Sequence, residues 1–488
     1  MENKFMNIND NRNLTMLMDY YELTMANGYY KLGLKDKWVC FDVFFRNIPE
    51  NGGYALAAGL ESIISYIVNM HFSDEDVEFL RSKGIFDEGF LEYLRNFKFT
   101  GDIDAVKEGT PIYPQTPIIS VCAPLCEAQM VETMLLVSFN HQSLIATKTN
   151  RITRAAEDRV VMEFGSRRAH SYDAAILGAR ASAIGGAKMT AATIVDQKFG
   201  FTATGTMAHS WVQFFDSDYE AFKAYAKVYP DSSVFLLDTF DVLGSGLPAA
   251  IKVAKEIIEP MGYRLKGVRI DSGDLAYLSK HIRQILDEAD MKDCSIVVSN
   301  SIDEYLIQSL NMQGAKIDSF GVGERLITSK SEPVFGGVYK LSAVRNDETG
   351  KFDPRIKISE NVEKIINPGR KKLYRIYDEN HLSKIDVVTL YDEEINPETF
   401  RMYDENKPWK NYRIEAGYTF EPLLTPIFRK GKLVYQVPTL KEIVEYTKVQ
   451  QSYIMEEEKR FAFPHQHYVD LSEDLYRLKV NMLKENYR

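Results

Sequence analysis

The chain has 488 residues, of which 45% are hydrophobic, so it is long and apolar enough for two or three domains. Its formal net charge of −10 and its lack of a long basic run argue against a general nucleic-acid or membrane-surface binder, while a local arginine cluster could still serve an anionic substrate. The N-terminus lacks the apolar core of a signal peptide, and no apolar run reaches membrane-spanning length. We therefore expect a soluble, cytoplasmic protein.

The N-terminal part of the chain alternates helix-forming and strand-forming segments. Apolar residues at helical spacing precede Gly33, which is a plausible helix stop, and a later β-rich segment contains several prolines that favour short or edge strands. In chain order we expect a helix at 14–34, a strand at 39–45, a helix at 56–69, short helices at 72–96, short strands within 98–123 and one long buried helix at 126–148.

The middle of the chain, from about 185 to 325, alternates apolar β-type runs with helical segments such as 247–258 and 274–289. This alternation predicts βαβ units and a parallel sheet or barrel that is covered on both faces. The predicted strands are 201–204, 233–237, 267–270, 295–299 and 317–320.

After about residue 335 the pattern changes to short strands separated by Gly, Pro, Asn and Asp, which is typical of an antiparallel domain. The expected strands are 338–344, 355–359, 372–378 and 385–392, followed by a charged, helical tail at 439–488.

The four cysteines are Cys40, Cys122, Cys126 and Cys294. Their spacing matches no common zinc pattern, and the CAPLC segment lacks the CxxC redox spacing. Four cysteines in so long a chain do not make a disulfide framework, so we predict reduced, buried thiols.

Polar side chains follow each predicted middle strand. Because the carboxyl ends of parallel strands share one face, these loops are expected to meet at a single rim. A lone histidine at a strand end is more often structural than catalytic, but five such loops make a constellation. The five loops contain Gly205–Ser210 with His209, then Asp238, Thr239 and Asp241, then Arg269 with Asp271–Asp274, then Asn300, Ser301 and Asp303, and finally Gly321–Arg325.

The residue types at this rim fit a sugar phosphate. The two carboxylates of Asp271–Asp274 suit ribose hydroxyls or a hydrated Mg²⁺, although a helix cap by Asp271 or Ser272 explains them equally well. Gly321–Arg325 suits a backbone phosphate cradle or a simple tight turn. Arg167 and Arg168 suit a polyanion or an ordinary ion pair on a helix face. No P-loop pattern is present, so any ATP is held differently.

With these motifs collected, the chain resembles the nicotinate phosphoribosyltransferases of the type II phosphoribosyltransferase family. Several of the shared motifs are specific, and their joint order makes chance similarity implausible. They are MDYYELTM at 18–25, FNHQSLIATK at 139–148, EFGSRRAH at 163–170, GTMAHSW at 205–211, VRIDSGDL at 268–275, FGVGERLITS at 320–329, GGVYKL at 336–341, NPGRKKLYR at 367–375 and PHQHYVDLSEDL at 464–475.

The resemblance implies transfer of the phosphoribosyl group of PRPP to nicotinate, giving nicotinate mononucleotide and pyrophosphate in NAD biosynthesis. It also implies coupling to ATP hydrolysis through a phosphohistidine, Mg²⁺ accompanying PRPP and ATP, and a homodimer with active sites at the subunit interface. The implied fold is α/β, an irregular or incomplete (β/α) barrel plus an α+β domain built from N-terminal and C-terminal β-rich segments. The expected segments are 1–125, 126–344, 345–435 and 436–488.

The resemblance also assigns site residues. His209 is the expected phosphohistidine, and it forms the catalytic set with Asp271, which would hold ribose hydroxyls, and Arg269. Tyr21, reaching from the partner subunit, and Phe164 would sandwich nicotinate. The expected substrate-binding residues are Tyr21, Phe164, Arg167, Thr206, Ser210, Asn300, Gly321, Gly323 and Arg325. No metal ligand is assigned.

Two departures from the family pattern bear on specificity. Ala191 aligns where nicotinamide-using relatives carry an aspartate, and alanine cannot accept a hydrogen bond from an amide, which disfavours nicotinamide. Ser166 and His170 are unusual in the arginine motif, which affects the expected base affinity. The alternatives are a nicotinamide or a quinolinate phosphoribosyltransferase, or an inactive paralogue that acts as a binding protein.

Overall fold

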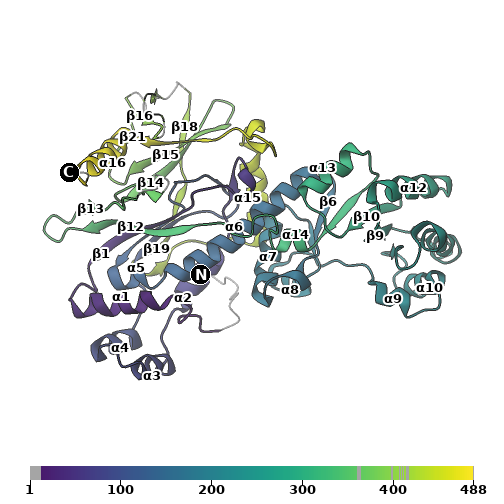
Figure 1. The fold of residues 1–488 in the computed structure, drawn as a ribbon, viewed down its shortest axis with the longest axis horizontal. Coiled ribbons are helices and arrows are strands. Elements are labelled where there is room, and N and C mark those ends of the chain that lie inside the picture. The colour runs from purple at the N-terminus through teal and green to yellow at the C-terminus, as the bar shows by residue number, and fades with distance from the viewer. Residues whose placement is uncertain are drawn as a thin grey trace. The chain divides into compact units, whose positions relative to one another are not determined.

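The computed structural model describes residues 12–359, 364–396, 399–405, 407, 409, 411–413 and 417–486. By its contacts the chain divides into two units, and Figure 1 shows the fold with its helices and strands labelled. Unit 1 comprises the residues up to Leu144 and those from Val334 onward, and unit 2 comprises Ile145–Pro333. The segment boundaries expected from the sequence remain predictions.

Unit 1 contains two large sheets and one strand pair among its described residues. The seven-stranded sheet has the order β13 (Phe352–Pro354), β12 (Val338–Arg345), β1 (Trp38–Phe44), β5 (Ile119–Pro124), β3 (Asp102–Val106), β19 (Leu424–Arg429) and β20 (Lys432–Leu433). The six-stranded sheet has the order β17 (Asn411–Arg413), β16 (Arg401–Tyr403), β21 (Tyr468–Ser472), β15 (Ser383–Leu390), β14 (Lys371–Tyr377) and β18 (Thr419–Pro422). Strands β2 (Ala55–Leu56) and β4 (Pro111–Ile112) form the pair.

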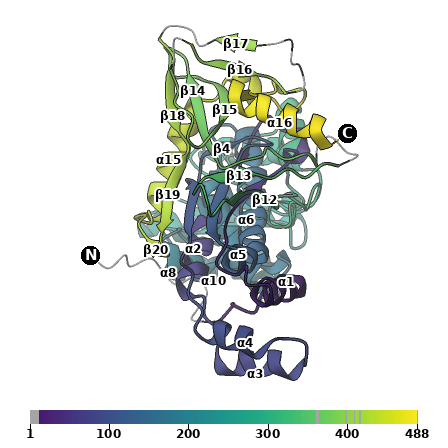
Figure 2. The same cartoon turned by 90° about the vertical axis from the view of Figure 1, so that its left-hand side faces the viewer.

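Helices pack on these sheets and enclose one large apolar core. Helix α5 contacts β1 and β5, and α16 lies beside β15 and β16, as Figure 2 shows. Phe41, Phe45, Phe90 and Tyr339 are among the side chains buried in the core. The helices are α1 (Tyr20–Lys31), α2 (Leu60–Asn69), α3 (Asp74–Ser82), α4 (Glu88–Arg95), α5 (Leu125–Gln129), α15 (Leu440–Ser452) and α16 (Glu473–Asn486), with α6 (Glu132–Ala155) running across the division into unit 2.

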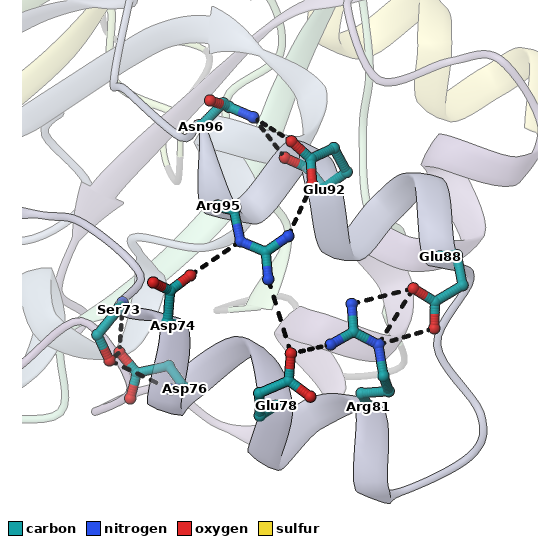
Figure 3. Close-up of polar contacts among 9 residues, drawn as sticks. All are labelled: Ser73, Asp74, Asp76, Glu78, Arg81, Glu88, Glu92, Arg95 and Asn96. Atoms are coloured by element: carbon teal, nitrogen blue, oxygen red, sulfur yellow. Dashed lines mark hydrogen bonds and ion pairs between the residues drawn. The ribbon is translucent and has the colours of Figure 1, made fainter.

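The helices α3 and α4 carry a network of exposed ion pairs (Figure 3). Arg81 pairs with Glu78 of its own helix and with Glu88 of α4, while Arg95 of α4 reaches back to Asp74. Such solvent-exposed pairs stabilise a fold by about 0–1 kcal/mol each. The pairing of these helices therefore rests mainly on their buried faces, which include Val77, Leu80, Phe90, Leu91 and Leu94.

Two cysteines correct the sequence prediction. Cys40 and Cys122 lie directly opposite each other in the antiparallel pairing of β1 with β5 and form a disulfide. The prediction of reduced thiols is wrong for this pair, because strand register brings together two residues separated by 82 positions in the chain. Cys126 and Cys294 are free and buried, as predicted, and burial raises the pKa of each thiol to about 12.

A fully buried cluster of charged groups joins the C-terminal strand β21 to β14 and β15. Arg375 donates to both carboxylate oxygens of Asp386, at 2.7 and 2.8 Å. His467 places Nε2 3.3 Å from Asp386 and Nδ1 3.1 Å from Glu458. Tyr113 stacks on the imidazole and donates to Glu458. Because both ring nitrogens face carboxylates, the cluster favours the doubly protonated imidazole.

This cluster predicts a pH-dependent stability. Burial opposes the charged form of His467, but the hydrogen bonds to Asp386 and Glu458 outweigh it and raise the pKa of the imidazole. Its contribution is therefore complete below the unfolded value of about 6.5 and is lost as pH rises through the raised folded pKa. We expect the difference in thermal midpoint between the wild type and His467→Gln to shrink from pH 6 to pH 9. A difference that is the same at every pH would contradict this assignment.

Unit 2 is built on a parallel sheet with helices on its faces (Figure 1). Its described strands have the order β7 (Met189–Thr190), β6 (Val160–Glu163), β11 (Ser319–Val322), β10 (Ser295–Ser299), β9 (Gly267–Ile270) and β8 (Val234–Leu236). The helices are α7 (Tyr172–Ile184), α8 (Thr193–Phe199), α9 (His209–Gln213), α10 (Asp218–Val228), α11 (Leu247–Val253), α12 (Leu275–Glu288), α13 (Glu304–Met312) and α14 (Glu324–Ile327). The predicted α/β class is confirmed, with a parallel sheet in unit 2 and mainly antiparallel sheets in unit 1.

Several element predictions are wrong in detail. The long helix expected at 126–148 is two helices, α5 and α6, that break at 130–131. The strand expected at 201–204 is a single bridge between Thr190 and Ala203, and no strand forms at 355–359. The tail contains β21, which pairs in parallel with β15. Among the described helices, none is long and apolar enough to cross a membrane.

Candidate active site

The carboxyl ends of the parallel strands in unit 2 meet at one rim, where their loops surround a cavity. Strands β6, β11, β10 and β9 are neighbours and run in the same direction, so the residues that follow them converge. The cavity has a volume of about 150 Å³. Its lining residues are Phe164, Arg167, Arg168, Arg269, Asp271, Ser299, Asn300, Ser301, Gly321, Gly323, Glu324 and Arg325. This set combines arginines, an aromatic ring and glycines, which suits an anionic ligand with a planar ring.

Arg269 holds the centre of this site together. Its Nη1 donates to Thr206 Oγ1 at 3.1 Å, and its Nη2 donates to Asp271 Oδ1 at 3.0 Å. Its Nε donates to Ser299 Oγ at 2.9 Å, and the guanidinium lies 5.7 Å from the centre of the Phe164 ring. Since the guanidinium is planar, three simultaneous bonds fix its orientation within the cavity wall.

The Asp271 turn is held from the neighbouring strand β8. Asp238 Oδ2 accepts from the Asp271 backbone N–H at 2.9 Å and from the Ser272 hydroxyl at 2.6 Å. The cap of α12 is Asp274, which accepts from the Tyr277 N–H. The alternative interpretation, in which Asp271 or Ser272 caps the helix, is therefore wrong, and the Asp271 carboxylate lines the cavity.

His209 is the first residue of α9, beside this turn. Its Nδ1 lies 3.2 Å from Thr239 Oγ1, and its Nε2 lies 4.0 Å from Asp271 Oδ2. The side chain is 42% exposed, while Met207, two residues earlier, is buried and anchors the loop. The imidazole is thus oriented by neighbours and remains reachable, as a group that reacts with a solvent-borne substrate must be.

The ring of Phe164 lies against the backbone of Gly321. A Cβ atom at position 321 would lie 2.5 Å from Phe164 Cδ2, which is too close for any real contact. We expect Gly321→Ala to push the ring into the cavity and to raise the KM for the aromatic substrate about tenfold, with a small loss of stability. Steady-state kinetics and thermal melting check this. Gly273→Ala is not a suitable control because its φ is +82°, whereas Gly205→Ala meets no atom within 4 Å and should change less.

Arg325 is held by the start of α13. It pairs with Asp303 Oδ2, while Asp303 Oδ1 caps the helix by accepting from Leu306 N–H at 2.8 Å. The next residue, Glu304, is fully buried and accepts from Lys148 and from Arg151, each at 2.9 Å. This buried pairing anchors the helix that positions Arg325.

Matches to known protein families cover most of the chain. The nicotinate phosphoribosyltransferase N-terminal domain matches residues 16–140, the nicotinate phosphoribosyltransferase family matches 160–381, and its C-terminal domain matches 370–479. Over 474 residues the chain is 44% identical to nicotinate phosphoribosyltransferase of Bacillus subtilis (strain 168), covering 97% of this chain and 96% of that protein. The chain belongs to the nicotinate phosphoribosyltransferase family.

Solved structures agree with this assignment. The crystal structure of human nicotinic acid phosphoribosyltransferase matches with a TM-score of 0.83 at 29% identity and covers 96% of this chain and 99% of that one. Nicotinate-nucleotide pyrophosphorylase from Pyrococcus furiosus shares the fold, with a TM-score of 0.69 at 22% identity, over 90% of this chain and 95% of that one. The family resemblance that the motifs indicate is therefore confirmed.

Most of the residues expected from the nicotinate phosphoribosyltransferase motifs come together at the rim. Phe164, Arg167, Arg269, Asp271, Asn300, Gly321, Gly323 and Arg325 line the cavity, and Thr206 joins it through Arg269. Ser210 is exposed on α9 and does not line the cavity. Tyr21 belongs to α1 of unit 1, where it is 44% exposed. The roles of all these residues remain predictions.

Sequence reasoning gave no role to Ser299, and it placed Asp238, Thr239 and Asp303 only in the set of rim loops. Each of them contacts a predicted site residue. Ser299 hydrogen-bonds to Arg269 and Asp271, Asp238 to Asp271 and Thr239 to His209, while Asp303 forms an ion pair with Arg325. The available signal was position, since each residue ends or follows a parallel strand.

Proposed function

We propose that this protein transfers the 5-phosphoribosyl group of PRPP to the ring nitrogen of nicotinate, giving nicotinate mononucleotide and pyrophosphate. The observation that carries the proposal is the cavity in which Phe164, Arg269 and Asp271 converge. An aromatic ring suits stacking on a pyridine, a guanidinium suits its carboxylate, and a carboxylate suits ribose hydroxyls. Family membership supports the same reaction.

The reaction breaks the bond between C1 of the ribose and the pyrophosphate oxygen and forms a bond from C1 to the pyridine nitrogen. Positive charge develops on the ribose, so the Asp271 carboxylate is suited to stabilise it. Backbone N–H groups near Gly321 and Gly323 are suited to the 5′-phosphate, and Arg167, exposed in the turn Ser166–Arg168, to the pyrophosphate. Catalysis would come chiefly from holding base and leaving group in line.

ATP would be coupled through His209. A ring nitrogen of the imidazole attacks the γ-phosphorus of ATP, a new N–P bond forms, and ADP leaves. Water later cleaves that N–P bond and releases phosphate. The exposure of His209 and its contact with Thr239 support this role. A phosphoryl group on His209 would add negative charge near Asp271, whose Oδ2 lies 4.0 Å from the imidazole Nε2. The added charge can therefore rearrange the loops of the rim during the cycle.

Mg²⁺ would arrive with the phosphates of PRPP and ATP. Among the described residues, no group of three or more His, Cys, Asp or Glu side chains could hold a metal by itself. Asp238 nevertheless has a buried oxygen, Oδ1, without a hydrogen-bond partner, and lies beside Asp271. These residues fit the usual Mg²⁺ site, in which one or two carboxylates supplement substrate phosphates and water. The bound ion would neutralise the charge that develops on the leaving pyrophosphate.

A homodimer would complete the site by bringing Tyr21 to the base. Helix α1 exposes Tyr20 by 50%, Tyr21 by 44% and Met25 by 39%, an apolar and aromatic face that suits a second copy of the chain. Sedimentation of the purified protein would report the oligomeric state directly.

The deciding experiment is product analysis. Purified protein is incubated with PRPP, Mg²⁺ and either nicotinate, nicotinamide or quinolinate, with and without ATP. We expect nicotinate mononucleotide from nicotinate, faster with ATP, and little product from the other bases. Ala191 supports this selectivity because a methyl group cannot accept from an amide. Product from nicotinamide or quinolinate would favour those enzymes, and no product with any base would favour an inactive paralogue.

A further inference from the structure

Glu163 is a fully buried carboxylate at the end of β6, immediately before the cavity residue Phe164. One carboxylate oxygen accepts from the backbone N–H of Gly165, and the other accepts from the hydroxyl of Thr190 at 2.6 Å. Burial raises the pKa of Glu163 against the opposing effect of these two bonds. The Glu163 carboxylate is thus removed from solvent and joins the turn after β6 to strand β7, a structural role that the proposed reaction does not require.

The first partner sets the turn that carries Arg167. Phe164 is fixed by its N–H, which donates to Val322 O at 2.8 Å, and the chain then turns at Gly165. A Cβ at position 165 would lie 2.5 Å from Ile327 Cβ, so this turn packs closely on α14. The bond from Gly165 N–H to Glu163 therefore holds a turn that has little freedom to move without disturbing Phe164.

The second partner leads to the histidine loop. Thr190 Oγ1, besides donating to Glu163, accepts from the N–H of Ala192 at 3.0 Å. The backbone of Thr190 bonds to Thr202 O at 3.1 Å and accepts from Thr204 N–H at 2.8 Å. The residues that follow Thr204 form the loop that ends in His209. Glu163 and Thr190 thus connect the Phe164–Arg167 turn to the segment that enters the His209 loop.

We propose that Glu163 is a positioning residue that, through Thr190, holds the Phe164–Arg167 turn in register with the His209 loop. The proposal rests on the proposed function for its kinetic consequences. Glu163 does not line the cavity and is completely buried, so it acts on the substrates only through the residues that it holds. Its loss would misplace the base and PRPP while leaving the imidazole of His209 able to react with ATP.

Two pairs of variants separate positioning from acid–base chemistry. Glu163→Gln keeps the shape, offers an oxygen to Gly165 N–H and donates to Thr190, whereas Glu163→Ala removes the bond that each partner makes to residue 163. Thr190→Ser keeps the hydroxyl, and Thr190→Val removes it at nearly constant shape. Glu288→Ala, on the exposed side of α12, is the matched control. The Thr190 pair keeps the test informative if Glu163→Ala folds poorly.

We expect Glu163→Ala and Thr190→Val to raise the KM for nicotinate and PRPP by about tenfold or more, and to increase the ATP consumed per product formed. Glu163→Gln and Thr190→Ser should stay within about threefold of the wild type, with an unchanged pH profile. If the kinetic defects of Glu163→Gln are as large as those of Glu163→Ala, the proposal is overturned in favour of proton transfer by Glu163. Wild-type kinetics in Glu163→Ala and Thr190→Val would also overturn it.

Amide hydrogen exchange provides a readout that does not depend on activity. We expect faster exchange over residues 164–168 and 202–209 in Glu163→Ala, and wild-type exchange there in Glu163→Gln. Unchanged exchange in Glu163→Ala would contradict the positioning role even in an active enzyme. Suppose instead that the wild type makes no nucleotide from any base while Glu163→Ala still exchanges faster than the wild type. That pair of results would support the positioning role and contradict only the proposed function.

Discussion

Replacing His209 with alanine is expected to lower the rate of nicotinate-stimulated ATP hydrolysis by more than about a hundredfold. A slow phosphoribosyl transfer that does not need ATP should remain. Alanine has no lone pair to attack the γ-phosphorus, so no phosphoenzyme forms. Arg269, Asp271 and Phe164 should stay in place without the imidazole. Thr206, Ser299, Asp238 and Gly321 hold them, while the His209 ring approaches Asp271 only to 4.0 Å. ADP and nicotinate mononucleotide are measured in the same reaction.

His281→Ala is the matched control, since His281 is a half-buried histidine of α12 whose ring bonds to and packs on Tyr277 of the same helix. It should leave both rates unchanged. Because His209 is 42% exposed, its replacement should change the free energy of unfolding by no more than about 0.5 kcal/mol. Full coupling of ATP hydrolysis to transfer in His209→Ala would remove the residue from this role.

The central strands of unit 2 could be predicted because their sequences are apolar on both faces. The runs at 267–270 and 295–299 match β9 and β10 residue for residue. The short strands β6 and β7 could not, because β7 has two residues and β6 ends in a glutamate. Buried strand positions usually carry apolar side chains, and a buried carboxylate such as Glu163 costs free energy unless it is hydrogen-bonded. The bonds from Gly165 and Thr190 offset part of that cost.

The parts of the candidate site that directly follow strands could be predicted from the sequence. Contacts between side chains on neighbouring strands could not, because they depend on strand order and register. Order along the chain is enough to place Arg269, Asp271 and Gly321 on one rim. It does not reveal that Ser299 lies between Arg269 and Asp271, because that contact depends on which strands are neighbours. The Cys40–Cys122 disulfide has the same cause, since pairing of β1 with β5 joins residues 82 positions apart.

Replacing Arg269 with alanine is expected to lower kcat/KM by about a hundredfold or more without unfolding the protein. The guanidinium makes three hydrogen bonds, all of them charge-assisted because the donor is a cation, and each such bond contributes about 1.5–3 kcal/mol. Its removal also leaves Asp271 without a positive neighbour at 3.0 Å, so the carboxylate and Thr206 can move away from the substrates. The KM values for nicotinate and PRPP report the loss.

Two further variants test whether charge or geometry matters at this position. Arg269→Lys keeps the charge but has a single nitrogen that cannot reach Ser299, Thr206 and Asp271 together, so we expect it to recover only part of the loss. Arg264→Ala, which breaks exposed ion pairs with Glu259 and Asp293 before β9, should retain wild-type kinetics. Since Arg269 lines a cavity, water can bond to the groups that it leaves, so the melting temperature should fall by less than the three lost bonds alone imply and the protein should stay folded in the assay. Unchanged KM values for both substrates in Arg269→Ala would show that the guanidinium does not hold the site.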